Sequence, residues 1–544
     1  MKSRPRYRGA VSLLLTVVLG WSLGSDVLAF QSGKRPHLAR DAQQASHRGV
    51  CEVELKIPNA SRSHFEPPWQ VTFTRPDAST ITVDAFPDGD DVYRARAYCD
   101  QVGRWRWSTT EAPKGLTRQS GEFQVAASDL PGKLRKHPQD SRQFAYDNGE
   151  WFLHIGDTGY RYVTDSEPRW RQYIDQAVQM GATKTRVWFC KSRYGVEALL
   201  TADRKAMNLP YWQEIDRRVT YALEHHPHLI LQLVPYGEDT DELRRYAQDD
   251  SGAFEIARHA QARFSAFPNV HWCISNDMIL GNSQNSQSGH RRLDADVIRR
   301  IGADIAKREP WGTLLTNHQS RHSGYDFTNE PWSDIITLED LDQVHGELIL
   351  EYRQKGRAPV VNDEDRYELY QPPANPRYFF RRLMWVSLLS GGHATYGGLK
   401  TYEPFDGQLQ GVQGYFDACK RGALAGGADD FVHIHTFFRD SGLTLVGYEP
   451  DDACVGNDPL RVKCIRNASN YIVYHANPSE TGPGSARPGA SPPEVNIMLP
   501  AKSFRVRWFE PATSQWTDSP NATGPKANLR APGGGDWMLL LQSN

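Results

Sequence analysis

Short apolar runs alternate with amphipathic segments from about residue 150 to residue 440, and few folds accommodate such an alternation. Apolar residues in the longer segments recur at i, i+3, i+4 and i+7, the spacing of one helix face. Strands that alternate with helices form a parallel sheet covered by those helices. The predicted strands are WFLHIG, TKTRVWF, HLILQLV, NVHWCIS, GTLLTN, SDIITL, APVVND and HATYGG.

Eight strand–helix units over roughly 285 residues fit a closed (β/α)8 barrel. The competing doubly wound sheet usually carries a glycine-rich phosphate turn after its first strand. Here that turn is GDTGYRY, which lacks the G-x-G-x-x-G spacing. The fifth unit is irregular, because no long helical segment separates GTLLTN from SDIITL.

Strand-like runs without intervening helices lie on both sides of the barrel. Apolar and polar residues alternate between turn signals every 8 to 12 residues, which is typical of β-sandwiches. The chain is therefore predicted to be multidomain, with a central (β/α)8 TIM barrel flanked by N-terminal and C-terminal β-sandwich domains. The predicted boundaries are 46–126 for the first sandwich, 127–140 for a linker, 141–440 for the barrel and 441–544 for the second sandwich.

The first 29 residues have the pattern of a secretory signal peptide. Four cationic residues precede an apolar run, and small or aliphatic residues at Val27 and Ala29 predict cleavage after residue 29. We therefore expect a secreted or periplasmic protein. In such a compartment Cys51 with Cys99, and Cys454 with Cys464, are plausible disulfide pairs.

Composition argues against several classes of partner. Lys and Arg number 63 against 65 Asp and Glu, and this balance gives no cationic face for nucleic acid. No apolar run after the signal is long enough to span a membrane. Neither C-x-x-C nor H-E-x-x-H occurs, so we expect no metal and no cofactor. The oligomeric state is not indicated.

Reactive groups of a (β/α)8 barrel lie at the C-terminal ends of its strands. The fourth run ends in Asn276 and Asp277, and the seventh ends near Glu364; these two strand ends face each other across a barrel. Two carboxyl groups about 5 Å apart are what retaining glycoside hydrolysis requires. We predict that Asp277 is the acid/base, that Glu364 is the nucleophile and that Asn276 binds the hydroxyl next to the anomeric carbon.

Simpler structural roles remain open for the same residues. Asp277 could cap the following helix, and Glu364 could pair with Arg366 or another loop cation. Other strand ends carry aromatic and polar side chains suited to sugars, although such residues are also common in barrel cores. The predicted substrate-binding residues are Trp188, Tyr236 and Tyr396 for stacking, and Asp157, Arg186 and His318 for hydrogen bonds.

Four motifs in the barrel region carry a family resemblance: GDT at 156–158, RVW at 186–188, PVVNDEDRYE at 359–368 and GGHATYG at 391–397. With a carboxylate after Asn276, they resemble the apiosidase-like (β/α)8 glycoside hydrolase family. The C-terminal segment WFEPATSQWTDSP, followed by DWMLLL, resembles a small domain named for collagen binding in a collagenase. The N-terminal sandwich resembles an uncharacterised domain that commonly precedes such barrels.

The sixth strand departs from the family pattern. It ends in Glu339 and Asp340, where the resemblance leads us to expect Gln, Ser or His-type residues. Glu339 is therefore a rival nucleophile, and the linkage cleaved need not involve apiose.

The sequence predicts an exported glycoside hydrolase that cleaves a plant or algal polysaccharide or oligosaccharide with retention. One alternative is a non-catalytic carbohydrate- or matrix-binding protein on the same scaffold. Another is a metal-dependent barrel hydrolase or lyase that uses the acidic cluster with His154 and His318.

Overall fold

A computed structural model describes most of the chain after the predicted signal peptide, which itself lies outside the described residues. The described residues are 37–40, 43–56, 63–65, 69–89, 91–110, 118–165, 167, 169–190, 197–280, 292–368, 373–397, 426–456, 458, 460–480 and 487–543. No helix within these ranges has the length and apolar character needed to cross a membrane.

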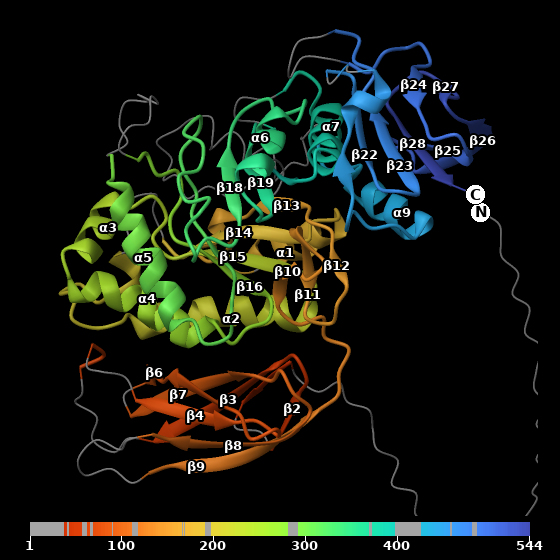
Figure 1. The fold of residues 1–544 in the computed structure, drawn as a ribbon. Helices are drawn as coiled ribbons and strands as arrows, with labels where there is room; N and C mark the ends of the chain where they lie inside the picture. The colour runs from red at the N-terminus through yellow and green to blue at the C-terminus, as the bar shows by residue number, and fades with distance from the viewer. Residues whose placement is uncertain are drawn as a thin grey trace, which may run out of the picture. The chain divides into compact units, whose positions relative to one another are not determined.

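Eight parallel strands form the central sheet in the order β17-β16-β15-β14-β13-β20-β19-β18 (Figure 1). The two outer strands also meet, because Thr316 Oγ1 lies 2.9 Å from Thr337 Oγ1 and the backbone N–H of Asp334 donates to Leu315 at 2.8 Å. The sheet is a nearly closed barrel, which confirms the predicted fold class. Its strands are β13 (Gly156–Thr158), β14 (Lys184–Trp188), β15 (Ile230–Val234), β16 (Val270–Cys273), β17 (Leu315–Thr316), β18 (Ile336–Glu339), β19 (Val360–Glu364) and β20 (His393–Tyr396).

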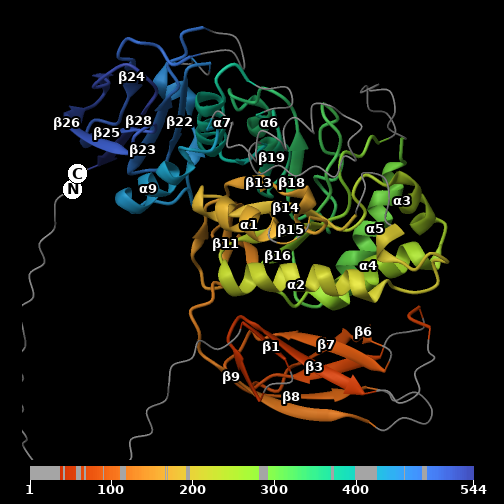
Figure 2. The ribbon, with the colours of Figure 1, turned by 180° about the vertical axis from the view of Figure 1, so that it is seen from behind.

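Amphipathic helices connect the barrel strands and lie around the sheet (Figure 2). Several begin at a side chain that accepts a backbone N–H, as Asp239, Asp250 and Asp294 do, and such caps stabilise a helix start. Residues 317–335 hold no helix between β17 and β18, which agrees with the irregular fifth unit. The helices are α1 (Arg169–Gln179), α2 (Leu209–His225), α3 (Thr240–Ala247), α4 (Ser251–Phe264), α5 (Ala295–Arg308), α6 (Glu347–Lys355), α7 (Pro376–Leu389) and α9 (Phe431–Ser441).

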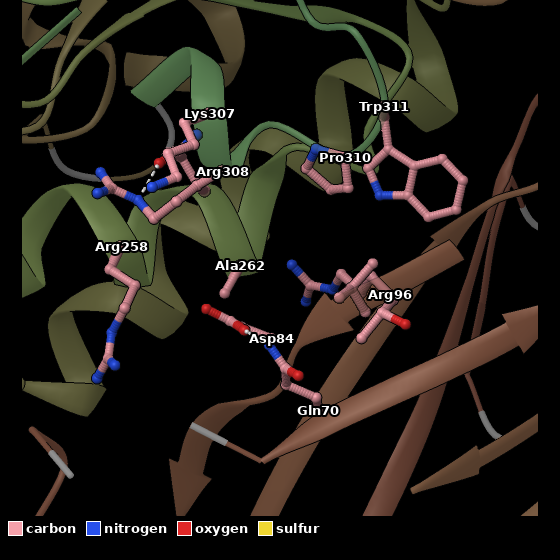
Figure 3. A pocket seen from close by; sticks show the side chains of 12 residues that line it. Gln70, Asp84, Arg96, Arg258, Ala262, Lys307, Arg308, Pro310 and Trp311 are labelled. Carbon is pink, nitrogen blue, oxygen red and sulfur yellow. Dashed lines mark hydrogen bonds between the residues drawn. The ribbon is translucent and has the colours of Figure 1, made fainter. Parts of the chain in front are cut away.

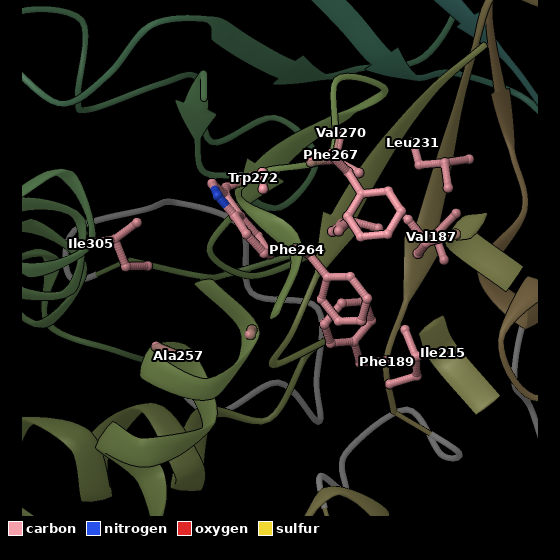
Figure 4. Packing of buried hydrophobic residues seen from close by; sticks show 14 of the residues in the cluster. Val187, Phe189, Ile215, Leu231, Ala257, Phe264, Phe267, Val270, Trp272 and Ile305 are labelled. Atoms are coloured by element: carbon pink, nitrogen blue, oxygen red, sulfur yellow. The ribbon is translucent and has the colours of Figure 1, made fainter. Parts of the chain in front are cut away.

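Side chains alternate between the two faces of each barrel strand. Val187 and Leu231 pack toward the helices with Phe264 (Figure 4). Gln232, the residue next to Leu231, and its cross-strand partner His271 point the other way and line the barrel interior. The interior is partly polar and encloses a cavity of about 10 Å³, close to the room needed for one water molecule.

A small antiparallel sheet closes the N-terminal end of the barrel. It comprises β10 (Leu134–His137), β11 (Asp140–Tyr146) and β12 (Trp151–Phe152), and its Phe144 and Phe152 pack against Ile230 and Val361. The first barrel strand therefore begins at Gly156, the last residue of the predicted run WFLHIG. Part of the predicted linker 127–140 is also strand, because its apolar side chains cover the end of the barrel.

The N-terminal region contains two facing sheets, β1-β3-β7-β6 and β2-β9-β8-β4-β5. Buried Val53, Phe73, Trp105 and Phe123 belong to its hydrophobic core. Inward and outward residues alternate along β9 and β4, as expected for strands with one buried face. The strands are β1 (Leu38–Arg40), β2 (Gln44–Ser46), β3 (Val50–Lys56), β4 (Gln70–Thr74), β5 (Thr80–Asp84), β6 (Phe86–Gly89), β7 (Val92–Tyr98), β8 (Gly103–Thr109) and β9 (Ser120–Ala126).

The C-terminal region is also β-rich, with a six-stranded sheet β21-β22-β23-β28-β25-β26 and a pair β24-β27. Val473, Phe504, Trp508 and Leu539 are buried in its core. Cys454 Sγ and Cys464 Sγ lie 3.4 Å apart as free thiols, so their pairing stays a prediction. The strands are β21 (Glu449–Pro450), β22 (Val462–Arg466), β23 (Asn470–His475), β24 (Glu494–Met498), β25 (Ser503–Glu510), β26 (Gln515–Thr523), β27 (Lys526–Arg530) and β28 (Trp537–Ser543).

The other cysteines of the described ranges are buried thiols too. Cys51 and Cys99 are both buried thiols in this structure, so their predicted pairing also stays a prediction. Cys190 Sγ donates to the Pro235 carbonyl at 3.4 Å, and Cys273 Sγ donates to the Ser275 carbonyl at 3.1 Å. Cys419 lies outside the described residues.

A buried ion-pair network joins β7 to the barrel helices. Arg96 donates to both Glu52 and Asp216, and Arg263 donates to Asp216 at 2.6 Å. A cavity of about 290 Å³ lies beside Arg96, between β-strand residues such as Asp84 and the ends of α4 and α5 (Figure 3). Much of its polar lining is already paired within the chain.

Candidate active site

Four titratable side chains converge at the C-terminal ends of adjacent barrel strands. Asp277, His318, Glu339 and Glu364 each place one oxygen or nitrogen within 4.8 Å of the others. Asp277 follows β16, His318 follows β17, and the two glutamates end β18 and β19. The two predicted catalytic carboxyl groups are therefore neighbours, and Glu339 is a third member of the group.

Asp277 lies in a strained stretch of backbone. Its φ is +49°, in the left-handed region that Asp tolerates better than most residues. Hydrogen bonds on both sides hold this turn: Asn276 N donates to Gly237 at 2.7 Å and Met278 N donates to His318 at 3.2 Å. The N-cap of α5 is Asp294, so Asp277 does not cap that helix.

Glu364 is held by two donors. The Tyr160 hydroxyl donates to Glu364 Oε2 at 2.9 Å, and Arg186 Nη1 donates to the same oxygen at 2.8 Å. Both stabilise a negative charge on the carboxylate. Of the alternative partners, Arg366 donates to Asp342 at 2.6 Å, whereas the loop cation Arg321 lies 3.9 Å from Glu364 Oε1.

A β-bulge aims Glu364 into the site. Leu338 pairs with Asn362 but Glu339 pairs with Glu364, which leaves Asp363 as an extra residue in β19. Asp363 faces the barrel interior and accepts a hydrogen bond from Lys184. Burial would raise the pKa of Asp363, but Lys184 and Arg186 outweigh it and hold that pKa well below its usual range.

Glu339 is the most buried carboxyl group of the cluster. Its side chain is 4% exposed, against 8% for Glu364 and 16% for Asp277. Arg321 Nε lies 3.0 Å from Glu339 Oε1, and Arg321 Nη2 lies 3.9 Å from Glu364 Oε1. Burial raises the pKa of Glu339 well above its usual value, and the charges of Asp277 and Glu364 raise it further.

Three of the predicted substrate-binding residues contact or belong to this group, and a fourth, Trp188, packs against Tyr160. Arg186 donates to Asn276 Oδ1, and Asn276 Nδ2 donates to Asp277 Oδ1 at 3.0 Å. His318 Nδ1 lies 3.2 Å from both the backbone N and Oδ1 of Asp277. The centroids of the Trp188 and Tyr160 rings lie 4.3 Å apart, and both side chains are buried in one cluster with Val234 and Cys273.

Three other predicted residues face the helices instead. Asp157 accepts a hydrogen bond from Tyr173 of α1 at 3.0 Å, and the Tyr236 hydroxyl donates to Ala253 of α4 at 2.8 Å. Tyr396 packs edge-on against Phe380 of α7. Their contacts with sugar stay a prediction. In this structure strand alternation turns Asp157 and Tyr396 toward the helices, whereas Tyr236 lies beyond the end of β15.

Sequence reasoning missed Tyr160, Arg321 and Lys184. Tyr160 lies within GDTGYRY, directly after a motif already noted, and Arg321 lies three residues after His318. Lys184 was not predicted because it lies at the start of a strand. A lysine on a buried strand nevertheless indicates a paired charge inside the fold. Burial lowers the pKa of Lys184 to about 8, although Asp363 opposes that shift.

The oxygen and nitrogen atoms of the four side chains of this cluster could coordinate a cation, but arginine side chains already contact two of the carboxylates. Arg321 contacts Glu339, and Arg186 contacts Glu364, so two guanidinium groups stand where a metal would need bare carboxylates. His154 lies in the barrel interior, with its ring 5.3 Å from that of His393. We therefore assign no metal to these side chains.

Family comparison agrees with the fold. Residues 138–437 match the model described as apiosidase-like, catalytic domain, and residues 49–112 match a domain of unknown function, DUF5060. The chain belongs to the apiosidase-like family and is a glycoside hydrolase by class. Among curated proteins no sequence matches it.

Solved structures share this architecture. A candidate glycoside hydrolase from Bacteroides vulgatus ATCC 8482 has a TM-score of 0.72 and 15% identity, over 92% of this chain and 100% of that chain. A family 5 glycoside hydrolase from the same strain has a TM-score of 0.57 and 15% identity, over 76% and 94%. At these identities the likeness shows the fold alone.

Proposed function

We propose that the protein is an exported, retaining glycoside hydrolase of a plant or algal polysaccharide or oligosaccharide, with Asp277 as acid/base and Glu364 as nucleophile. The observation that supports this most directly is that an oxygen of Asp277 and an oxygen of Glu364 lie within 4.8 Å of each other. Retaining enzymes hold their carboxyl groups about 5–5.5 Å apart, and inverting enzymes about 6.5–9.5 Å.

In the first step, a Glu364 oxygen attacks the anomeric carbon while Asp277 protonates the departing oxygen. Tyr160 and Arg186 hold the attacking carboxylate in one orientation. In the second step, Asp277 takes a proton from water, and the water oxygen displaces Glu364 from the sugar. Two inversions leave the anomeric configuration unchanged.

In this proposal Asn276 binds the sugar hydroxyl next to the anomeric carbon. It is held by Arg186 and itself donates to Asp277, so its amide is fixed beside both carboxyl groups. A hydrogen bond from such an amide to the adjacent sugar hydroxyl strengthens as positive charge develops on the ring.

The test is sugar release from a panel of plant and algal polysaccharides, with the product anomer followed by NMR. We expect retention, and we expect Asp277→Asn and Glu364→Gln each to lower kcat by about 10³-fold or more. Glu351→Gln is the control, because this exposed side chain pairs with Lys355 far from the cluster.

Other outcomes would contradict the proposal. Inverted product would exclude Glu364 as nucleophile. Glycan binding without turnover would favour the non-catalytic carbohydrate-binding alternative, and loss of turnover with a chelator would favour the metal-dependent one.

A further inference from the structure

Two side chains of β14 reach across the barrel interior to the end of β19. Lys184 and Arg186 are two residues apart on β14, so they point to the same face of the sheet. The strand order places β13 and β20 between β14 and β19, so backbone pairing does not connect these two strands directly. Side chains inside the barrel make the connection instead.

Asp363 is the residue that both side chains hold. Its carboxylate accepts hydrogen bonds from Lys184 and from the Thr395 hydroxyl of β20. Its backbone carbonyl accepts a hydrogen bond from Arg186 Nη1 at 2.8 Å. The same Nη1 donates to Glu364 Oε2 at 2.8 Å, so one guanidinium nitrogen connects Asp363 to the proposed nucleophile.

An ion pair is an uncommon filling for the interior of a barrel. Large branched apolar side chains normally occupy that space, whereas the side chains of Lys184 and Asp363 are each 2% exposed. Burying two charges costs free energy that their attraction only partly offsets, and an apolar pair of similar volume is often as stable or more stable. Stability alone therefore gives little reason for a lysine–aspartate pair here.

The β-bulge gives the pair a different role. Asp363 is the extra residue of β19 in the pairing with β18, and a bulge bends its strand and re-aims the side chains beside it. Because no β18 residue is in register with Asp363, other contacts must hold the bulge in one shape. Lys184 and Thr395 hold the Asp363 side chain, and Arg186 holds its carbonyl.

We propose that Lys184 and Asp363 are positioning residues, whose ion pair fixes the bulge in β19 and so holds the Glu364 carboxylate against Tyr160 and Arg186. This inference rests on the proposed function for its effect on turnover. Neither residue of the pair bonds to substrate, so its loss misplaces the carboxylate and removes no group that binds sugar. A misplacement of about 1 Å in a reacting group can lower kcat by about 100-fold.

The first test replaces the whole pair by apolar side chains of similar size, in the double variant Lys184→Met with Asp363→Leu. We expect its urea midpoint to stay close to that of the wild type, because no buried charge is left without its partner. We expect kcat on the best substrate of the panel to fall by about 100-fold, with KM little changed. An unchanged kcat would overturn the inference.

A second buried lysine–aspartate pair provides the matched control. Lys463 of the C-terminal region is 1% exposed and donates to Asp452, which also accepts the backbone N–H of Cys464 at 2.8 Å. The double variant Lys463→Met with Asp452→Leu should leave kcat unchanged. An equal fall of kcat in both double variants would be a general effect of removing a buried ion pair, and it would overturn the role of Lys184 and Asp363.

A milder variant keeps the inference testable if the leucine variant does not fold. Lys184→Met with Asp363→Asn removes both charges, but the asparagine oxygen can still accept the Thr395 hydroxyl. We expect kcat to fall less than in the leucine variant. A kcat equal to that of the wild type would overturn the inference here too.

The last measurement needs no turnover. Crystal structures of the wild type and of a folded double variant should show that Glu364 Oε2 loses its hydrogen bond to Tyr160, to Arg186 or to both. A Glu364 carboxylate that keeps both contacts in the variant would overturn the inference. A wild-type protein that turns over none of the substrates would contradict the proposed function, while the crystal structures would still decide what holds Glu364.

Discussion

Glu364 shows how single contacts define a reactive group. One of its oxygens accepts both the Tyr160 hydroxyl and an Arg186 N–H, so the carboxylate has one orientation. The sequence predicted Glu364 and Arg186 from their strand ends, but it did not predict Tyr160, which lies on the short helical turn Tyr160–Tyr162 after β13. Periodicity identifies strands, and it carries no information about turns of this kind.

Tyr160→Phe should lower kcat by about 10- to 100-fold, because a hydrogen bond to a charged group contributes about 1.5–3 kcal/mol. The measurement is steady-state kinetics on the best substrate of the panel. Tyr162→Phe is the control: its buried hydroxyl donates to the Arg218 carbonyl at 2.9 Å, away from the carboxyl cluster. It should cost about 1 kcal/mol of stability and leave kcat unchanged. Equal loss of kcat in both variants would contradict the assigned role of Tyr160.

At the scale of elements, strand parity decides which side chains reach the site. Thr395 faces the barrel interior and contacts Asp363, while its neighbour Tyr396 packs on α7. Tyr396 lies at the predicted strand end with its ring against Phe380 of α7, and its contact with sugar stays a prediction. Because side chains alternate along a strand, a shift of one residue in the pairing register would exchange the inward and outward faces.

Gly156→Ala tests the packing between β13 and β20. An added Cβ would lie 2.1 Å from Thr395 Oγ1 and 2.9 Å from Thr395 Cβ, so Thr395 would have to leave Asp363. We expect a loss of about 1–3 kcal/mol in the free energy of unfolding, measured by urea titration. Gly89→Ala is the control, since its nearest neighbour would be Val92 Cβ at an ordinary 3.7 Å. An unchanged urea midpoint for Gly156→Ala would contradict this expectation, because it would show that the barrel accommodates the added Cβ without loss of stability.

At the scale of the whole molecule, buried charge connects regions that are distant in sequence. Arg96 on β7 bridges Glu52 and the helix residue Asp216, and all three are buried. Hydrophobic patterning predicted the sandwich and the barrel separately. It gave no indication of this contact, because the pairing depends on which surfaces meet after folding.

Arg96→Met should lower the free energy of unfolding by about 3–5 kcal/mol, because it leaves buried carboxylates without their cation. Arg104→Met is the control. Arg104 is 63% exposed and lies 3.7 Å from Glu122, and such surface pairs contribute about 1 kcal/mol or less. Urea unfolding followed by fluorescence measures both variants. A similar small effect in each would contradict the importance of the buried network.

Local patterns in the chain were enough to establish the barrel, the flanking β-rich regions and the positions of Asp277 and Glu364, because periodicity and strand ends are properties of short segments. Only the folded molecule decided that a bulge frees Glu364 from strand alternation, and that Arg321 and a third carboxyl group lie beside it. Those features depend on contacts between segments far apart in sequence, and burial makes their charges interact strongly.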